Sequence, residues 1–253
     1  METREEVILN RNGKRMPATI MLPAGAPKGT FVVLHGLGGW KDQTVVHTAA
    51  ATVTAEGYIA VSFDAADGAL APDSNTLLST TTSFLEDLED VVVWTKQQLW
   101  FVGPICLAGH SLGGMVSVEY VAKHPIEIQK LILLSPAVSW KLYTPFFFPF
   151  AVWWYVRGVH YSPGPNKTRI PLGRAWLIDF LSFDIRKRVK NISIPTLVVI
   201  GANDGVVGST KAIQKFAQGF FRGTFVVIPK ARHTLFGYER PLADTIRTWL
   251  TSS

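Results

Sequence analysis

The sequence has a single cysteine, Cys106, among its 253 residues. One cysteine excludes an intramolecular disulfide and any zinc site built from several thiolates. Charged residues are also scarce, at 17%, whereas apolar residues make up 47%. A chain with this composition can bury a large core, which excludes a disordered protein and fits one large α/β domain. Because Cys106 lies in an apolar run, we expect it to be a buried, inert thiol.

A targeting segment and a membrane-spanning segment are also missing. The first residues, METREEVILN, are charged and lack the apolar stretch of a secretory signal, so the sequence predicts a cytoplasmic protein. The aromatic stretch LYTPFFFPFAVWWYV, residues 142–156, contains two prolines. It is shorter than the ~20 residues that a membrane-spanning helix needs. We therefore expect it to cover a pocket.

Acidic residues are nearly absent from residues 141–190, which hold two acids and nine Lys or Arg. The segment therefore carries a net charge of +7, although the whole chain carries +6. A nucleic-acid-binding protein usually has recognisable motifs along a basic face, and none is present, so no nucleic-acid partner is expected. Thirteen of the 29 aromatic residues lie between residues 137 and 190. The charge leaves three possibilities open: a solvated basic face, attraction of anionic substrates, or peripheral contact with an anionic membrane.

Apolar runs typical of strands alternate with helical patterns along the rest of the chain. A hairpin is expected over residues 7–22, with its tight turn at Asn12-Gly13. Buried strands are expected over residues 30–36, 58–64, 102–109, 128–135, 195–202 and 223–230, and helices over 41–56, 84–100, 112–124 and 241–250.

The helix expected over residues 84–100 has the clearest start signal. Ser83 and Glu86 match the S-x-x-E pattern of a capping box. Its predicted apolar stripe, at helical spacing, consists of Leu85, Leu88, Val92 and Leu99.

Buried strands that alternate with helices predict a mostly parallel, doubly wound sheet covered on both faces. The alternation stops where the aromatic and basic segment begins. We therefore expect a core formed by residues 1–137 and 191–253, with residues 138–190 inserted as an aromatic-rich, basic cap.

The sequence CLAGHSLGGMVS has the pattern of a nucleophile elbow. Gly109, Ser111 and Gly113 form G-x-S-x-G, with a predicted strand before the serine and a predicted helix after it. Such a turn is too tight for side chains on both sides of the serine, and it lifts the hydroxyl above the sheet. Ser111 is therefore the candidate nucleophile.

A serine needs a base, and the base needs an orienting acid. Asp204 follows one buried strand and His233 follows the next, at the strand ends where functional groups collect in such sheets. The chain order Ser, Asp, His is that of one known triad arrangement. The alternative interpretation of Asp204 is a turn-forming residue, and that of His233 is a solvated loop histidine. If Asp204 were not the acid, Asp179 or Asp184 would be the first replacements to test.

The sequence LHGLGG, residues 34–39, ends the first buried strand. The backbone N–H groups of Leu37 and Leu112 are the candidate donors of an oxyanion hole. The glycines of this loop also fit a simple strand-to-helix turn, and both interpretations can hold together. His35 and His110 are interpreted as structural residues without a proton-transfer role.

These motifs give the chain a family resemblance. It resembles serine α/β-hydrolases of the carboxylesterase and monoacylglycerol-lipase type, and within them the bacterial cinnamoyl (feruloyl) esterases. The resemblance runs through HGLGG, GHSLGG, KHPIEIQKLILLSPA, IPTLVVIGANDGVV and ARHTLF. It implies the α/β-hydrolase fold, with Ser111 as nucleophile, Asp204 as acid and His233 as base. The cinnamoyl esterases tend to carry Gln after the nucleophile and F-D-x-N-G-H-G after the second buried strand, where this chain has Leu112 and FDAADGA.

The resemblance implies a cofactor-free carboxylic ester hydrolase with an acyl-enzyme intermediate and a small-molecule ester substrate. Amide or carbon–carbon bond hydrolysis on the same three residues is an alternative, as is a non-catalytic binding protein with this fold. No metal-ligand cluster is visible, so no metal is expected. Trp140 and Tyr143 lie nearest the end of the fourth buried strand and are the candidate residues of the substrate pocket.

Overall fold

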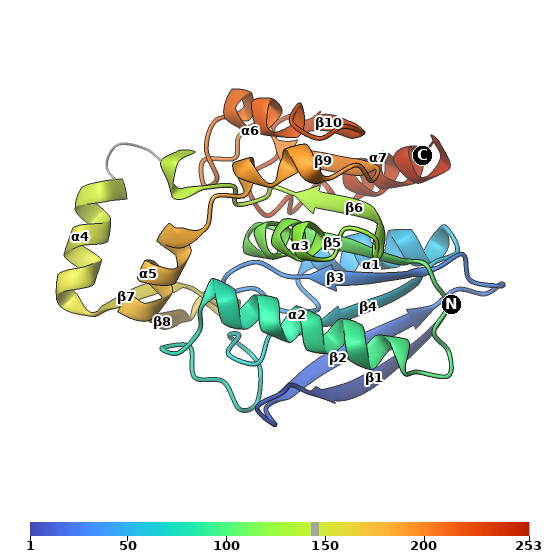
Figure 1. The fold of residues 1–253 in the computed structure, drawn as a ribbon, viewed down its shortest axis with the longest axis horizontal. Helices are drawn as coiled ribbons and strands as arrows, with labels where there is room; N and C mark the ends of the chain where they lie inside the picture. The colour runs from blue at the N-terminus through green and yellow to red at the C-terminus, as the bar shows by residue number, and fades with distance from the viewer. Residues whose placement is uncertain (143–146, 253) are drawn as a thin grey trace.

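The structure, a computed structural model, describes residues 1–142 and 147–252. Its centre is an eight-stranded sheet with the strand order β1-β2-β4-β3-β5-β6-β9-β10 (Figure 1). The strands from β4 to β10 in this order are parallel to one another, and β1 and β2 pair antiparallel. The parallel strands are β3 (Thr30–Leu34), β4 (Ile59–Phe63), β5 (Ile105–His110), β6 (Ile128–Leu134), β9 (Thr196–Gly201) and β10 (Gly223–Ile228). This confirms the mostly parallel sheet that the sequence predicts.

The expected N-terminal hairpin is also confirmed, as β1 (Glu2–Leu9) and β2 (Arg15–Leu22). Its turn is held by the Asn10 side chain, which accepts hydrogen bonds from the backbone N–H groups of Asn12 and Lys14, both at 3.0 Å. Gly13 has a φ of +73°, which favours glycine at that position.

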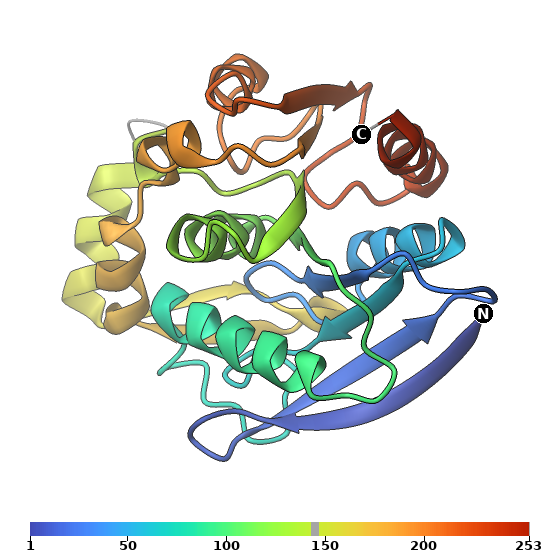
Figure 2. The same cartoon turned by 45° about the vertical axis from the view of Figure 1, so that its right-hand side comes forward.

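Helices cover both faces of the sheet. Helices α1 (Thr44–Ala55) and α7 (Glu239–Ser252) pack together on one face, and α2 (Thr81–Lys96), α3 (Leu112–Lys123) and α6 (Thr210–Ala217) cover the other (Figure 2). The side chains of each buried strand divide between two cores, as the period of two in a strand requires. In β3, Phe31 packs with α1 and Val32 packs with α2. The free thiol of Cys106 is buried, and burial raises its pKa to about 12.

The predicted start and apolar stripe of α2 are wrong in two details. The N-cap is Thr80, whose hydroxyl accepts the Ser83 N–H at 2.9 Å, while the Ser83 hydroxyl accepts the Thr80 N–H at 3.0 Å. A serine hydroxyl thus fills the position that the pattern gives to glutamate, and Glu86 lies 4.0 Å from Arg11 instead. Because the helix ends at Lys96, Leu99 is fully exposed and does not belong to the buried stripe.

The described residues between 138 and 190 pack beside the sheet, with their two helices at the left of Figures 1 and 2. They form α4 (Phe147–Arg157), the antiparallel pair β7 (Val159–Pro163) and β8 (Arg169–Gly173), and α5 (Arg174–Ser182). The two ends of the segment meet, since the Ile185 N–H donates to the Val138 carbonyl at 3.1 Å. Trp176 stacks between Trp154 and Phe180, with ring centroids 5.3 and 4.8 Å apart. No helix among the described residues has both the length and the apolar character needed to cross a membrane.

The N-cap of α2 can be tested by two substitutions. Thr80→Ala should lower the free energy of unfolding by about 1 kcal/mol, because the Ser83 N–H then has no side-chain acceptor. Glu86→Gln should change it by less than about 0.5 kcal/mol, because Glu86 contributes only an exposed ion pair. Urea unfolding followed by circular dichroism measures both. A larger loss for Glu86→Gln than for Thr80→Ala would show that the helix begins where the sequence pattern places it.

Candidate active site

Ser111 lies in a sharp turn between β5 and α3. Its φ of 52° and ψ of −114° are unfavourable for a residue with a Cβ atom, so the surrounding structure must hold the turn. Two backbone hydrogen bonds do this at 2.9 Å each: the Ser111 N–H donates to Leu134, and the Ser111 carbonyl accepts from Ala137. The hydroxyl is therefore presented from a backbone position that β6 and the chain after it fix.

The glycines beside Ser111 are required by close backbone contacts. A Cβ atom on Gly109 would lie 2.4 Å from the Gly113 carbonyl oxygen. One on Gly113 would lie 2.4 Å from the carbonyl oxygen of His35, at the end of β3. Any larger residue would push strand and helix apart, which accounts for the G-x-S-x-G pattern on packing grounds alone.

The structure brings Ser111, His233 and Asp204 together, although they are far apart in the sequence. His233 Nε2 lies 3.0 Å from Ser111 Oγ, and His233 Nδ1 lies 2.9 Å from Asp204 Oδ2. An ionised carboxylate accepts only, so Nδ1 carries the proton and Nε2 is left as the acceptor for the serine hydroxyl. This is the hydrogen-bond order of a nucleophile, a base and an orienting acid.

The surroundings of Asp204 favour its ionised form. Burial is the largest single effect and would raise the pKa of this carboxyl, but the hydrogen bonds and the charge around it, those of His233 first, together outweigh burial and lower the pKa overall. The second carboxylate oxygen accepts the N–H of Val206 at 2.8 Å. The side chain of Asp204 has no exposed surface, so solvent does not screen its interaction with His233.

His110 is buried behind this chain. Its Nε2 lies 3.1 Å from the backbone carbonyl oxygen of His233 and therefore donates to it. Burial lowers the pKa of His110 to about 3, so the ring stays neutral, and its contact helps to place the His233 backbone.

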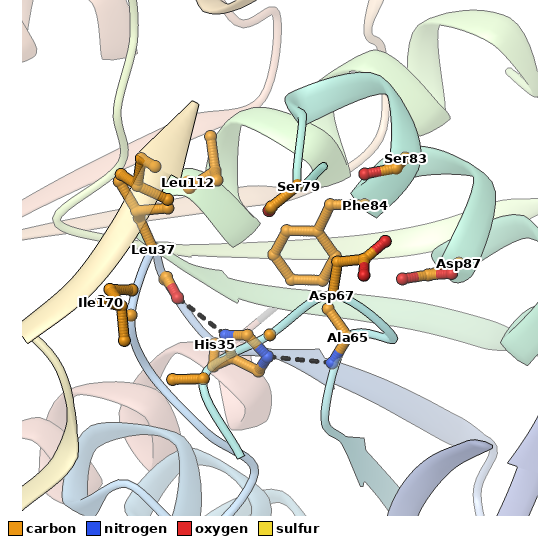
Figure 3. A pocket seen from close by; sticks show the side chains of 15 residues that line it. His35, Leu37, Ala65, Asp67, Ser79, Ser83, Phe84, Asp87, Leu112 and Ile170 are labelled. Atoms are coloured by element: carbon orange, nitrogen blue, oxygen red, sulfur yellow. Dashed lines mark hydrogen bonds between the residues drawn. The ribbon is translucent and has the colours of Figure 1, made fainter. Parts of the chain in front are cut away.

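His35 holds the loop after β3. Its Nδ1 donates to the Gly36 carbonyl oxygen at 2.7 Å and its Nε2 accepts the Ala65 N–H at 3.1 Å (Figure 3). Burial also lowers the pKa of His35, and both hydrogen bonds suit the neutral ring. A Cβ atom on Gly36 would lie 2.9 Å from Ser111 Cβ, so the loop runs directly against the serine.

A cavity of about 560 Å³ opens at these residues. Ser111 and His233 line it, together with the two candidate oxyanion donors, Leu37 and Leu112. Leu112 is the first residue of α3, and an N–H at that position has no partner within its own helix. Residues 138–190 provide most of the aromatic wall, namely Phe147, Trp154, His160, Trp176 and Phe180.

The two candidate pocket residues are placed differently. Trp140 is not among the described residues that line this cavity; it packs partly buried against the core, with the Lys141 ammonium 5.7 Å from its ring centroid. Tyr143 lies outside the described residues. The aromatic content of residues 138–190 indicates that the segment covers a pocket. The spacing of these aromatic residues in the sequence does not indicate that Trp154 and Trp176 line the cavity.

The described part of the cavity wall is largely apolar. Among the described residues that line it there is no Asp, Glu, Lys or Arg, and its polar side chains come from Gln43, His110, Ser111, His160, Ser162, His233 and Thr234. The basic residues of the 138–190 segment therefore do not line it. Asp179 accepts hydrogen bonds from Thr82 at 2.6 and 2.9 Å, and Asp184 binds Arg186 at 2.6 and 2.7 Å, so neither carboxylate is the partner of His233.

Comparison with known proteins agrees with this architecture. Residues 25–172 match the protein family described as "Serine aminopeptidase, S33". No curated protein sequence matches the chain. Many solved structures share the fold, which confirms the predicted α/β-hydrolase fold.

Three of these structures illustrate the likeness. Est1E from Butyrivibrio proteoclasticus with bound ferulic acid is 18% identical, covers 98% of both chains and has a TM-score of 0.80. An esterase of Pyrococcus furiosus is 15% identical over 99% of this chain and 90% of its own, with a TM-score of 0.73. A serine hydrolase of Xanthomonas campestris described as lacking a lid is 18% identical over 100% and 95%, with a TM-score of 0.68. At these identities the likeness concerns the fold.

A second, much smaller cavity of about 20 Å³ is also lined by the loop after β3, through Leu37 and its neighbours (Figure 3). Asp87 of α2 lines it and accepts hydrogen bonds from the Asn10 side chain at 2.9 Å and the Ala66 N–H at 2.8 Å. Burial raises the pKa of Asp87 to about 6, and the carboxylates of Asp67 and Asp90 add to the rise. The predictions made from the sequence do not separate this buried aspartate from the partly buried acids of the same helix.

Asp87 should make folding stability depend on pH. Its carboxyl binds a proton more tightly in the folded protein than at the ordinary value of 3.8, so its contribution to stability is full below about pH 4 and is lost as pH rises through about 6. Asp87→Asn has no ionisable group at this position, so its stability should not fall in this way as pH rises. The free energy of unfolding of the variant, relative to wild type, should therefore rise by up to about 3 kcal/mol from acid to neutral pH.

Urea unfolding over a pH series measures this difference. The hydrogen bond to Asn10 that the variant loses shifts the whole curve without changing its pH dependence. Glu6→Gln, at an exposed position on β1, is the control and should run parallel to wild type. A parallel curve for Asp87→Asn as well would contradict the raised pKa.

Proposed function

The chain belongs to the family described as serine aminopeptidase, S33, and from this premise we propose that it is a serine carboxylic ester hydrolase for small to medium acyl or aryl esters. The observation that carries the proposal is the hydrogen-bonded chain from Ser111 through His233 to Asp204 beside the large apolar cavity. The reaction class follows from these groups, because an activated serine at such a site attacks carbonyl carbon.

In the first half of the proposed reaction, Ser111 Oγ attacks the ester carbonyl carbon while His233 Nε2 takes the hydroxyl proton. The buried Asp204 carboxylate stabilises the imidazolium that forms and keeps the ring oriented. The carbonyl oxygen becomes an oxyanion, for which the N–H groups of Leu37 and Leu112 are the proposed donors. The intermediate then collapses as His233 protonates the departing alcohol, which leaves the acyl group on Ser111.

In the second half, water takes the place of the alcohol. His233 Nε2 removes a proton from the water as its oxygen attacks the acyl carbon, and the resulting oxyanion occupies the same two N–H groups. The bond to Ser111 Oγ breaks, His233 returns the proton to that oxygen, and the carboxylic acid leaves. No cofactor or metal takes part in either half.

Residues 138–190 are proposed to act as a cap over this site. Support comes from the side chains of Phe147, Trp154 and Trp176, which form part of the cavity wall. Walls of this kind exclude water, which strengthens the interaction of the oxyanion with its donors. Their aromatic faces also suit an aryl or extended acyl group.

Peptide hydrolysis is the second candidate, because the family description names an aminopeptidase. An aminopeptidase must bind the charged amino group of its substrate, and a carboxylate in the site is the usual means of balancing such a charge. The described cavity-lining residues include no Asp or Glu. The uncharged wall therefore favours an ester with apolar substituents.

A substrate series separates these candidates. We expect turnover of p-nitrophenyl esters of increasing acyl length, methyl ferulate and a monoacylglycerol to exceed that of an aminoacyl p-nitroanilide, because the described lining of the cavity includes no carboxylate to balance an ammonium ion. The measurement is kcat/KM for each compound. Methyl ferulate is included because Est1E is described with bound ferulic acid. This chain has Leu112 where the cinnamoyl esterases tend to carry Gln, and FDAADGA where they tend to carry F-D-x-N-G-H-G. Preference for the anilide would replace the ester proposal with the peptidase.

Substitution of the three residues tests the mechanism. Ser111→Ala and His233→Ala should each lower kcat by at least about 10³-fold with the fold intact, because the members of such a triad act as a unit. Asp204→Asn should lower kcat by as much or less. Ser252→Ala and His47→Ala, at exposed positions outside the described cavity lining, are matched controls and should leave kcat unchanged. Near wild-type turnover of Asp204→Asn would mean that another group orients the base.

A further inference from the structure

Helix α4 has an apolar outer face that no other described element covers. Its inner residues, Ala151 and Trp154, are buried. The outer face consists of Phe148, Val152, Trp153, Tyr155 and Val156, with exposed fractions of 67, 48, 48, 51 and 73%. Both views place α4 along the outer edge of the molecule (Figures 1 and 2). A surface helix normally presents polar residues on this side, so a contiguous apolar face of this kind indicates a binding surface.

The charge around this face is positive. Residues 138–178 contain no aspartate or glutamate. The guanidinium of Arg157 lies 5.3 Å from the ring centroid of Trp153, and that of Arg174 lies 5.6 Å from the ring centroid of Tyr155. Cations are therefore held directly against the exposed aromatic rings. Three further basic residues of the segment, Lys141, Lys167 and Arg169, are also exposed.

The positive charge also limits what the face can bind. A second copy of the chain would bring the same cations against the first, and the repulsion would oppose the gain from burying apolar rings. Anionic substrates do not account for the charge, because the described lining of the cavity includes no Lys or Arg. An anionic bilayer accounts for both the apolar face and the positive charge. Its headgroups attract Arg and Lys, while Trp, Tyr and aliphatic side chains enter the interface.

We propose that the outer face of α4 binds peripherally to an anionic lipid surface. The helix would lie in the plane of the interface, with its inner face still forming the wall of the large cavity. Because Phe147 and Trp154 line that cavity, binding would bring the cavity wall next to the bilayer. The proposal concerns binding alone and stands independently of the proposed ester hydrolysis.

Co-sedimentation with vesicles tests it. The wild-type protein should sediment with vesicles of phosphatidylcholine and phosphatidylserine, and should remain in solution with phosphatidylcholine alone. Binding should weaken as salt rises, because screening shortens the reach of the charges to about 8 Å at physiological ionic strength. A wild-type protein that binds neither vesicle, or binds both equally, would overturn the proposal.

Two variants locate the surface. Trp153→Ser with Val156→Ser should abolish sedimentation with the anionic vesicles, as should Arg157→Glu with Arg174→Glu. All four residues are exposed, so circular dichroism should show an unchanged fold. Phe221→Ser and Lys211→Glu, at exposed positions far from α4 in the sequence, are the matched controls and should bind like wild type.

Hydrolysis of a soluble p-nitrophenyl ester should be unchanged in the α4 variants, which separates a binding defect from a failure of the proposed activity. Sedimentation velocity tests the competing explanation, that the outer face of α4 binds a second copy of the chain. A dimer that forms in the wild type and is lost in the Trp153 and Val156 variant would assign the face to a second copy of the chain and overturn lipid binding. Undiminished vesicle binding by both α4 variants would also overturn it.

Discussion

The backbone of Ser111 is held in a conformation that is unfavourable for an isolated serine, and the rest of the site depends on it. This conformation persists because the hydrogen bonds to Leu134 and from Ala137 hold the turn, and because β5, α3 and the end of β3 approach one another closely at Gly109 and Gly113. The same approach places Gly36 against Ser111, so one packing arrangement positions both the hydroxyl and the loop that carries Leu37. The candidate nucleophile and the candidate oxyanion donors are therefore set by backbone packing in the core rather than by flexible side chains.

Burial then determines what the surrounding polar groups can do. His35 and His110 are kept neutral by burial and act through hydrogen bonds to backbone groups. Asp204 is buried as well, yet His233 and the Val206 N–H favour its ionised form. Two of the three histidines around the elbow thus position the loops, and His233 alone joins the serine to a carboxylate. Its role is set by its surroundings, since the residue type is the same in all three.

Much of this arrangement could be predicted because it depends on local sequence rules. The strand pattern, the Asn12-Gly13 turn and the glycines around Ser111 each reflect a short-range constraint. Features that depend on packing at a distance could not be predicted. The N-cap of α2 is Thr80 rather than Ser83, because the hydroxyls of Thr80 and Ser83 form the capping box in place of the usual serine and glutamate pair. The residues of the cavity wall follow from how α4 and α5 fold onto the core, and the raised pKa of Asp87 arises from a burial that its helix pattern does not reveal.

Ser111 is proposed to be reactive because the packing of the elbow presents its hydroxyl and the His233–Asp204 pair can remove its proton. A fluorophosphonate reacts with a serine hydroxyl only when a base assists the removal of its proton. The most direct measurement is the rate and position of labelling, followed by peptide mass spectrometry. We expect rapid labelling of Ser111 alone in the folded protein, and labelling slowed by orders of magnitude in His233→Ala. Absence of label on folded wild-type Ser111, or equal labelling rates in the two proteins, would contradict it.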